Sequence, residues 1–350
     1  MKTFNGVIRM RGSRPVLLAM VCVGVLLNTC GAEEGVSPRV DTAVVRGLEF
    51  LATRQQVDGS FEAQGPKVAV TSLCLLGFMA SGHVAGDGRY GQSMRRGLDF
   101  VIDQFPADGY VGKVDNSRMY GQGIITLALA EAYGVERDEA RRRRIRPILV
   151  KATEVIIAAQ KVQKDENNSG GWRYEPGSAD SDLSLSGWNA LALRACNNIG
   201  ISANKQSIDR ATSYVLKCYR KDQKAFSYQP GQNVSLAMTG VGVLNLCLMD
   251  RASAPEVAEA AAYLMSNGVT DDTRFAYYSS YYATHAAFQL GDPAWSKVWK
   301  ANSEYMVARQ QEDGGWPASR SGEEPGRIYA TSMAVLTLSA PNRLLPVHQK

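Results

Sequence analysis

Several features that would signal a particular chemistry are scarce in this sequence. Its 350 residues include only three histidines, His83, His285 and His348, and six cysteines. None of the cysteines forms a Cys-X-X-Cys pair or follows an aspartate in an Asp-X-Cys segment. So few ligand-type residues, without metal-ligand spacing, argue against zinc. The sequence therefore predicts no metal and no cofactor.

The net charge is also small. The formal net charge is +5, and part of it comes from the run RRRRIR at residues 141–146, which reads as the solvated start of a helix. So small an excess predicts no nucleic-acid partner.

Long apolar runs are absent apart from VLLAMVCVGVLL, Val16 to Leu27. That run is too short for a membrane-spanning helix, which takes roughly 20 residues. Basic residues precede it and small residues, Thr29 to Ala32, follow it, so residues 1–32 are predicted to be an export signal. We expect a periplasmic or secreted protein with no transmembrane segment in the mature chain. Alternatively, LNTCG resembles a bacterial lipobox, which would anchor the protein through Cys30.

What the sequence does contain is a repeat. RQQVDGSF, Arg54 to Phe61, is nearly repeated as RQQEDGGW, Arg309 to Trp316. Six apolar segments share one register, each opening with a small polar residue or glutamine, and five of them carry leucine five residues later. They are TSLCLLGF at Thr71, QGIITLAL at Gln122, SGWNALAL at Ser186, TGVGVLNL at Thr239, THAAFQL at Thr284 and TSMAVLTL at Thr331. Such a period is typical of a repeated supersecondary unit.

An amphipathic segment precedes each apolar segment, and a turn carrying an aromatic residue joins the two. The pattern predicts an all-α protein of six helical hairpins, with solvent-facing outer helices and apolar inner helices, over residues 42–340. The hairpins could close into an α/α toroid or form an open superhelix. The phrase shared by the first and last repeats favours closure.

The QxxDGGW phrase followed by an apolar inner helix resembles the prenyltransferase and squalene-cyclase repeat superfamily. The resemblance implies a single toroid whose axial cavity holds an isoprenoid or presents a peptide-binding face. The class II terpene cyclases of this superfamily carry Asp-X-Asp-Asp before an inner helix. Asp182 falls on the acid of that motif, although Leu183 stands where its third aspartate would be. The GCGEQ motif of complement-like thioester domains is absent.

The segment before the third inner helix supplies the first candidate site residues, Asp182, Asp180 and Glu175. An aspartate at a helix start is ordinarily a cap, and the helix dipole lowers its pKa. A second carboxylate at Asp180 would raise one of the two pKa values if both faced a dry cavity. Asp182 and Asp180 are therefore catalytic candidates, and Glu175 is a candidate ligand contact.

The fifth repeat supplies the other candidates. In the register above, His285 occupies a position where the other five repeats have glycine or serine, so its imidazole could point into the axial cavity as an acid, base or ligand donor. Tyr278, Tyr281 and Tyr282 lie on the same helical stripe and could line a pocket mouth. Trp188, in the third inner helix, is a further candidate ligand contact.

These observations favour an exported protein that binds an apolar or extended ligand at the rim of its inner helices. The ligand could be an isoprenoid lipid, a peptide or a glycan. One alternative is an acid-initiated isoprenoid cyclase that uses Asp182, and another is a polysaccharide-processing toroid; whether the protein is an enzyme is left open. Because the inner helices of a toroid run parallel, we expect Asp180, Asp182 and His285 to gather at one mouth of the cavity.

Overall fold

The computed structural model describes residues 37–61, 65–201, 205–322 and 324–349. Val36–Lys350 form one compact unit. The predicted export signal at residues 1–32 and the alternative lipid anchor at Cys30 lie outside the described residues and remain predictions.

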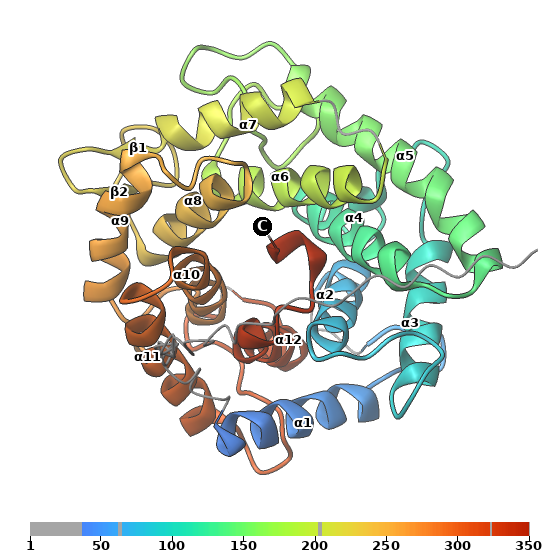
Figure 1. Cartoon of the computed structure of the whole chain (residues 1–350). Helices are drawn as coiled ribbons and strands as arrows, with labels where there is room; N and C mark the ends of the chain where they lie inside the picture. The colour runs from blue at the N-terminus through green and yellow to red at the C-terminus, as the bar shows by residue number, and fades with distance from the viewer. Residues whose placement is uncertain (1–36, 62–64, 202–204, 323, 350) are drawn as a thin grey trace, which may run out of the picture. The chain divides into compact units, whose positions relative to one another are not determined.

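Twelve helices account for most of that unit and alternate along the chain between two concentric layers (Figure 1). The outer helices are α1 (Pro38–Thr53), α3 (Gly91–Asp103), α5 (Glu139–Lys161), α7 (Lys205–Lys217), α9 (Pro255–Ser266) and α11 (Ala294–Arg309). The inner helices are α2 (Lys67–Ala80), α4 (Arg118–Val135), α6 (Leu183–Asn198), α8 (Leu236–Leu248), α10 (Ala276–Leu290) and α12 (Gly326–Leu338). Short elements complete it: η1 (Val111–Lys113), β1 (Tyr219–Arg220) paired with β2 (Ala225–Phe226), η2 (Ala340–Asn342) and η3 (Pro346–His348).

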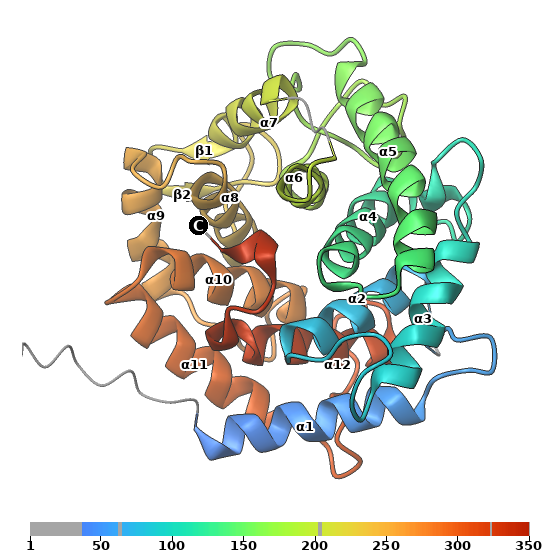
Figure 2. The ribbon, with the colours of Figure 1, turned by 45° about the vertical axis from the view of Figure 1, so that its right-hand side comes forward.

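The six hairpins close into a ring. Each inner helix contacts the next, and α12 returns to contact α2 and α1 (Figures 1 and 2). At the seam the Arg46 guanidinium donates to the carbonyl oxygen of Gln311, with 2.8 Å between Nη2 and O. A methyl group at Gly47 would lie 2.8 Å from the Trp316 ring, so α1 packs directly on that indole. The predicted α/α toroid is confirmed, and the open superhelix is wrong.

The two layers follow from the sequence pattern. Nearly every side chain of α2 and α8 is buried, because these helices are apolar on all faces and have neighbours on all sides. The outer helices α1 and α3 bury one apolar stripe and expose the opposite face. Within the described part of the chain, no helix is both long and apolar enough to cross a bilayer.

A glutamine at the end of three outer helices joins neighbouring hairpins. In each case the amide nitrogen donates at 2.8 to 2.9 Å to two backbone carbonyls, one in its own turn and one in the next outer helix: Gln55 to Gly59 and Ser93, Gln160 to Gly170 and Ser207, and Gln310 to Gly314 and Ala43. The turn residue in each set is a glycine with positive φ, a conformation that disfavours other residues. The repeated sequence RQQxDG thus forms a hydrogen-bonded contact between neighbouring hairpins. The contact made by Gln310 connects the last hairpin to the first and closes the ring.

The aromatic residue after each turn behaves as predicted in four of the six repeats. Phe61, Trp172, Phe226 and Trp316 are fully buried. Each donates its backbone N–H to a hydroxyl in the first turns of the following inner helix, at Thr71, Ser186, Thr239 and Thr331. Tyr110 and Phe275 depart from the pattern and stay partly exposed.

Candidate ligand-binding site

The inner helices run parallel, so the ring has two different mouths. At one mouth their N-terminal turns meet: the Tyr120 hydroxyl of α4 donates to Ser184 Oγ of α6 at 2.6 Å. At the other mouth their C-terminal ends meet, as where Ser81 Oγ lies 3.0 Å from Ser339 Oγ. We call these the N-terminal mouth and the C-terminal mouth.

Asp182 lies at the N-terminal mouth and is fully buried. Its Oδ1 accepts hydrogen bonds from Leu185 N at 3.0 Å and Ser184 Oγ at 2.6 Å, so it is the N-cap of α6, as its ordinary interpretation predicts. Burial raises the pKa of the Asp182 carboxyl, whereas the bonds from Ser184 and Leu185 and the ion pair with Arg173 oppose that shift. With Tyr120 donating to Ser184, a hydrogen-bonded chain runs from the mouth to this carboxyl.

Arg173 separates the two aspartates that the sequence suggested would act as a pair. Its Nη1 lies 2.6 Å from Asp182 Oδ2, and its Nε lies 2.9 Å from Asp180 Oδ2. A cation between two carboxylates removes the mutual repulsion that would have raised one pKa. The paired-carboxylate hypothesis is therefore wrong. Arg173 also donates to the Tyr228 hydroxyl at 2.5 Å and lies over the Tyr174 ring.

Partly exposed tyrosines surround the N-terminal mouth. They come from the first turns of inner helices and from the loops that lead into them: Tyr110, Tyr120, Tyr174, Tyr228 and Tyr329. The Tyr120 and Tyr174 rings lie 6.2 Å apart between centroids. Glu175 joins this rim, where it pairs with Arg118 at 3.2 Å and accepts from the Tyr110 hydroxyl at 3.3 Å. The sequence interpretation identified Glu175 but none of these five tyrosines.

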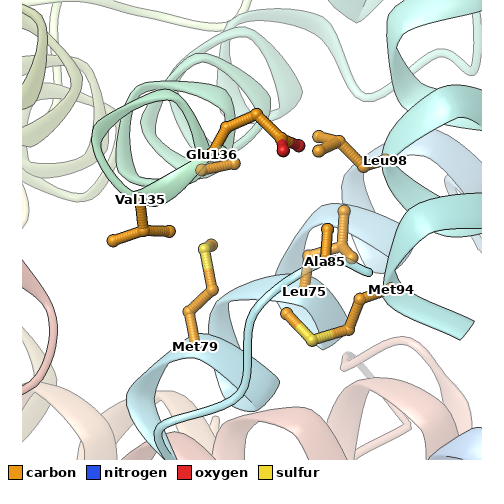
Figure 3. A pocket seen from close by; sticks show the side chains of 8 residues that line it. Leu75, Met79, Ala85, Met94, Leu98, Val135 and Glu136 are labelled. Atoms are coloured by element: carbon orange, nitrogen blue, oxygen red, sulfur yellow. The ribbon is translucent and has the colours of Figure 1, made fainter. Parts of the chain in front are cut away.

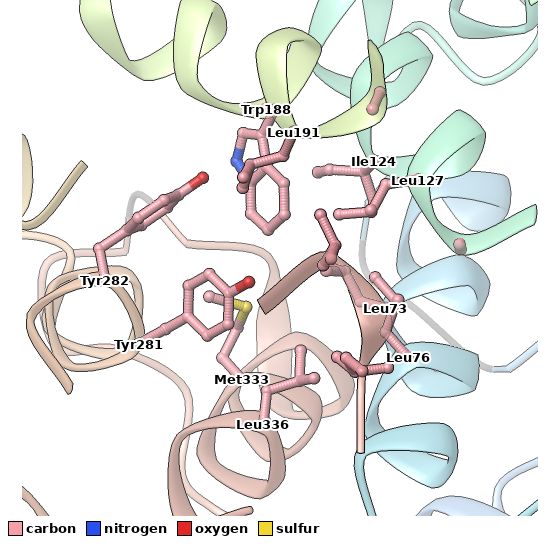
Figure 4. Close-up of a cluster of buried hydrophobic side chains, with 14 of the residues drawn as sticks. Leu73, Leu76, Ile124, Leu127, Trp188, Leu191, Tyr281, Tyr282, Met333 and Leu336 are labelled. Atoms are coloured by element: carbon pink, nitrogen blue, oxygen red, sulfur yellow. The ribbon is translucent and has the colours of Figure 1, made fainter. Parts of the chain in front are cut away.

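The four predicted aromatic contacts lie on the inner wall. Figure 4 shows Trp188 of α6 and Tyr281 and Tyr282 of α10 pointing into the same central space. The Trp188 and Tyr281 rings stack at 5.7 Å, and Tyr282 meets Trp188 edge-on at 5.4 Å. Tyr278 lies one helical turn before Tyr282, and the centroids of the two rings are 4.7 Å apart. All four side chains are buried, so they form the wall and are not an exposed rim.

Two asparagine side-chain oxygens on the inner helices lack partners. Among the described residues, Asn189 Oδ1 and Asn245 Oδ1 accept no hydrogen bond. The Tyr278 hydroxyl, in contrast, interacts with the hydroxyls of Tyr120 and Tyr282. Buried polar atoms are otherwise almost always satisfied by protein, water or a ligand.

Glu324 is a residue that the sequence interpretation missed. It is buried just before α12, and its Oε1 accepts from Tyr278 N at 3.0 Å, which caps the first turn of α10. Burial raises the pKa of its carboxyl, whereas hydrogen bonds from the backbone of Tyr278 and from the side chains of Ser319 and Tyr329 oppose that shift. The only available signal was its position two residues before an inner helix, similar to that of Asp182.

His285 lies away from this site. The sequence alignment of the fifth repeat was shifted by four residues, which is one helical turn. A methyl group at Gly123 would lie 3.0 Å from the backbone of Asn189 in the next inner helix, and one at Gly240 would lie 2.7 Å from that of Ala283. Asn189 is the fourth residue of the segment that begins at Ser186, so the matching start in α10 is Ser280 and not Thr284.

In the corrected register, the residue that interrupts the small-residue position is Tyr281. His285 takes the place of the leucine found in the other five repeats, at Leu76, Leu127, Leu191, Leu244 and Leu336. Its Nε2 lies 3.3 Å from the carbonyl oxygen of Leu336, near the C-terminal end of α12. The expectation that Asp180, Asp182 and His285 share one mouth is therefore wrong.

Two further hollows lie among the described residues. A cavity of about 10 Å³ between α2, α3 and α4 is lined by apolar side chains and Glu136 (Figure 3) and is too small for a ligand. A cleft of about 320 Å³ lies beside the first turn of α10, between α11 and residues 317–320. Tyr277, Tyr305, Arg309 and Arg320 line it, with Asp271 paired to both arginines. This cleft is on the N-terminal side of the ring and is large enough for a small ligand.

The fold defines the class: this is an α/α toroid protein. Comparison with family models and with curated proteins finds no match. Solved structures are similar. An α-1,6-mannanase, GH76A from Salegentibacter sp. HEL1_6, has a TM-score of 0.64 at 11% identity, over 87% of this chain and 99% of that chain. A glycosidase in complex with glucose has 0.59 at 12%, over 88% and 98%. The type II terpene cyclase MstE from Scytonema has 0.57 at 12%, over 88% and 98%. At such identities the similarity shows the fold alone.

Proposed function

We propose that the protein binds an extended ligand at the N-terminal mouth of its ring, and that the ligand is a glycan chain. The observation that carries the proposal is the rim of five partly exposed tyrosines above the buried aromatic wall of Tyr278, Tyr281, Tyr282 and Trp188. Aromatic faces with a few convergent polar groups are typical of a small-molecule site. Localisation in the periplasm or outside the cell, predicted from the export signal, is part of the proposal.

A glycan fits this mouth better than an isoprenoid lipid. A prenyl chain gains most from a dry apolar wall and makes no hydrogen bonds to the tyrosine hydroxyls that surround this mouth. A sugar can stack on tyrosine faces and hydrogen-bond to these hydroxyls, and the Arg118–Glu175 pair adds a donor and an acceptor at the rim. The mannanase and the glucose-bound glycosidase show that this fold is compatible with saccharides in other proteins.

An acid-initiated isoprenoid cyclase is the second candidate. The observation in its favour is the buried Asp182, whose pKa burial raises and whose carboxyl is linked to Tyr120 through Ser184. The ion pair with Arg173 opposes this role, because it stabilises the carboxylate form that cannot donate a proton.

Native mass spectrometry of the purified protein mixed with oligosaccharides, prenyl alcohols and apolar peptides tests the proposal. We expect an oligosaccharide to bind and its affinity to fall at least tenfold in Tyr329→Ala. Trp295→Ala is the matched control, because this partly exposed aromatic residue lies on outer helix α11. Retention of prenyl alcohols alone, lost in Asp182→Asn, would favour the cyclase.

A further inference from the structure

The C-terminal mouth of the ring contains a segment of the chain itself. Asn342, which ends η2, and the next two residues are exposed, and the chain then enters the ring at Leu345 and forms the single turn η3 (Figures 1 and 2). Val347 is fully buried, and Leu345 and His348 are 4% and 6% exposed. We define residues 344–349 as the C-terminal segment.

Side chains of three inner helices bind the backbone of this segment. Glu131 of α4 accepts from Val347 N at 3.2 Å. Arg194 of α6 donates to the carbonyl oxygens of Val347 at 3.3 Å and Gln349 at 2.9 Å. Gln289 of α10 donates to the carbonyl oxygen of His348 at 2.6 Å. Together these side chains satisfy one N–H and three carbonyls, which is how a protein binds a peptide ligand.

Two side chains of the segment add specificity. Val347 enters the apolar lumen, while His348 lies against Tyr281 and His285 of α10. The His348 Nε2 is 3.2 Å from the Tyr281 hydroxyl, and its ring centroid is 4.1 Å from that of His285. His285 occupies the position that is leucine in the other repeats, and this is where the His348 ring packs.

The ring does not need the segment for closure, since α12 contacts α2 and α1 directly. Arg194 also donates to the carbonyl oxygen of Leu248 at the end of α8, so its guanidinium is positioned by the ring as well as by the segment. The exposed residues Asn342 and Arg343 connect the segment to the ring and allow it to leave. Side chains of the ring thus bind the backbone of the segment as they would bind a peptide ligand.

We infer that the C-terminal mouth is a peptide-binding site, that residues 344–349 are its ligand in cis, and that a peptide of the same kind can replace them in trans. The ligand class is a short apolar peptide with a buried aliphatic residue at the place of Val347 and carbonyls that reach Arg194 and Gln289. This site is independent of the glycan proposal, because it occupies the opposite mouth.

The test is binding of a fluorescent peptide with the sequence of residues 344–350, LLPVHQK, measured by anisotropy. The full-length chain, a chain ending at Arg343 and the full-length variant Val347→Asp are compared. The buried aspartate should expel the segment without shortening the chain. We expect the truncated chain and Val347→Asp to bind the peptide at least tenfold more tightly than the full-length protein, whose site is occupied.

Two controls test how the peptide is recognised. A peptide with aspartate in place of Val347 should bind the truncated chain at least tenfold more weakly. In the truncated chain, Arg194→Met should weaken binding to a similar extent, whereas Arg137→Met, at an exposed arginine, should leave it unchanged. A truncated chain that keeps its helical circular dichroism but does not bind the peptide would overturn the inference. Loss of the helical fold on truncation would also overturn it, because the segment would then be part of the core.

Discussion

The imidazole rings of His285 and His348 lie 4.1 Å apart between centroids, inside the ring of inner helices. Both are buried, and burial lowers the pKa of His285 to about 4 and that of His348 well below its usual value. Both therefore remain neutral at neutral pH. Among the described residues, Tyr281 of α10 contacts both rings and Arg194 of α6 acts on His348, while Glu131 of α4 acts on Tyr281.

Acid should weaken the fold through these histidines, and His285→Leu should reduce the effect. The pKa of His285 is about 4 when folded and 6.5 in the ordinary state. As pH falls from 6.5 to 4, the unfolded chain takes up a proton that the folded chain excludes, so the free energy of unfolding drops by about 3 kcal/mol. Urea unfolding at pH 7 and 4.5 should show a smaller loss in His285→Leu. Equal losses in both proteins would contradict this account.

Glu131 should have the opposite effect on the pH dependence of stability: it should lower the free energy of unfolding as the pH rises. Burial raises the pKa of its carboxyl from 4.5 to about 8. As pH rises from 4.5 to 8, the unfolded chain releases a proton that the folded chain keeps, so stability is complete below pH 4.5 and declines towards pH 8. Glu131→Gln keeps the acceptor for Val347 N and removes the titration. Its free energy of unfolding should exceed that of the wild type by a few kcal/mol at pH 8, on the order set by that shift, and should change less with pH.

A matched control for Glu131 is available on the same helix end. Glu136 pairs with Arg141 at 3.2 Å, so Glu136→Gln removes an ion-pair partner. It should lower stability at both pH 5 and pH 8. If Glu131→Gln lowers stability in the same way, Glu131 is an ordinary ionised partner and the assignment fails.

Arg173→Met should destabilise the protein by about 3–5 kcal/mol, because it leaves Asp182 buried without its cation. Arg89→Met is the comparison: its pair with Glu49 is exposed on both sides, and exposed pairs contribute about 0–1 kcal/mol. Chemical denaturation of the two variants measures the difference. Similar small losses would mean that the Asp182 carboxyl is protonated without Arg173, which would revive its role as an acid.

Ring closure can be tested through Gln310, which joins the last turn to α1. Gln310→Ala removes two hydrogen bonds to the carbonyls of Ala43 and Gly314 and should cost about 1–3 kcal/mol. Its neighbour Gln311 has an exposed side chain, so Gln311→Ala should be neutral within about 0.5 kcal/mol. Hydrogen exchange should be accelerated in α1 of Gln310→Ala alone. Unchanged exchange in α1 would argue against a structural role for this contact.

Periodicity predicted the layers, the hairpins and the closure, because each depends on a pattern that recurs in all six repeats. It failed for the fifth repeat because a shift of four residues leaves a helix face nearly unchanged. Thr284 and His285 therefore matched the pattern as well as Ser280 and Tyr281 do, and only the contact between Gly240 and Ala283 separates the two alignments.

The candidate site was predicted less completely. Asp182 was placed correctly as a cap, but the position of Arg173 between two aspartates depends on the path of a loop, which periodicity does not describe. The rim tyrosines were missed because they are spread over loops and first turns of different repeats. The C-terminal segment was missed because it is held by side-chain contacts to three distant helices and has no helical pattern of its own.

The central claim, an extended ligand at the N-terminal mouth, is tested most directly by hydrogen exchange with and without the oligosaccharide that binds best. The account predicts slower exchange in the first turns of α4 and α12 and in the loops that carry Tyr174 and Tyr228. It predicts no change in α11 around Trp295 or in the C-terminal segment. Slower exchange confined to the C-terminal mouth or to the outer helices would contradict it.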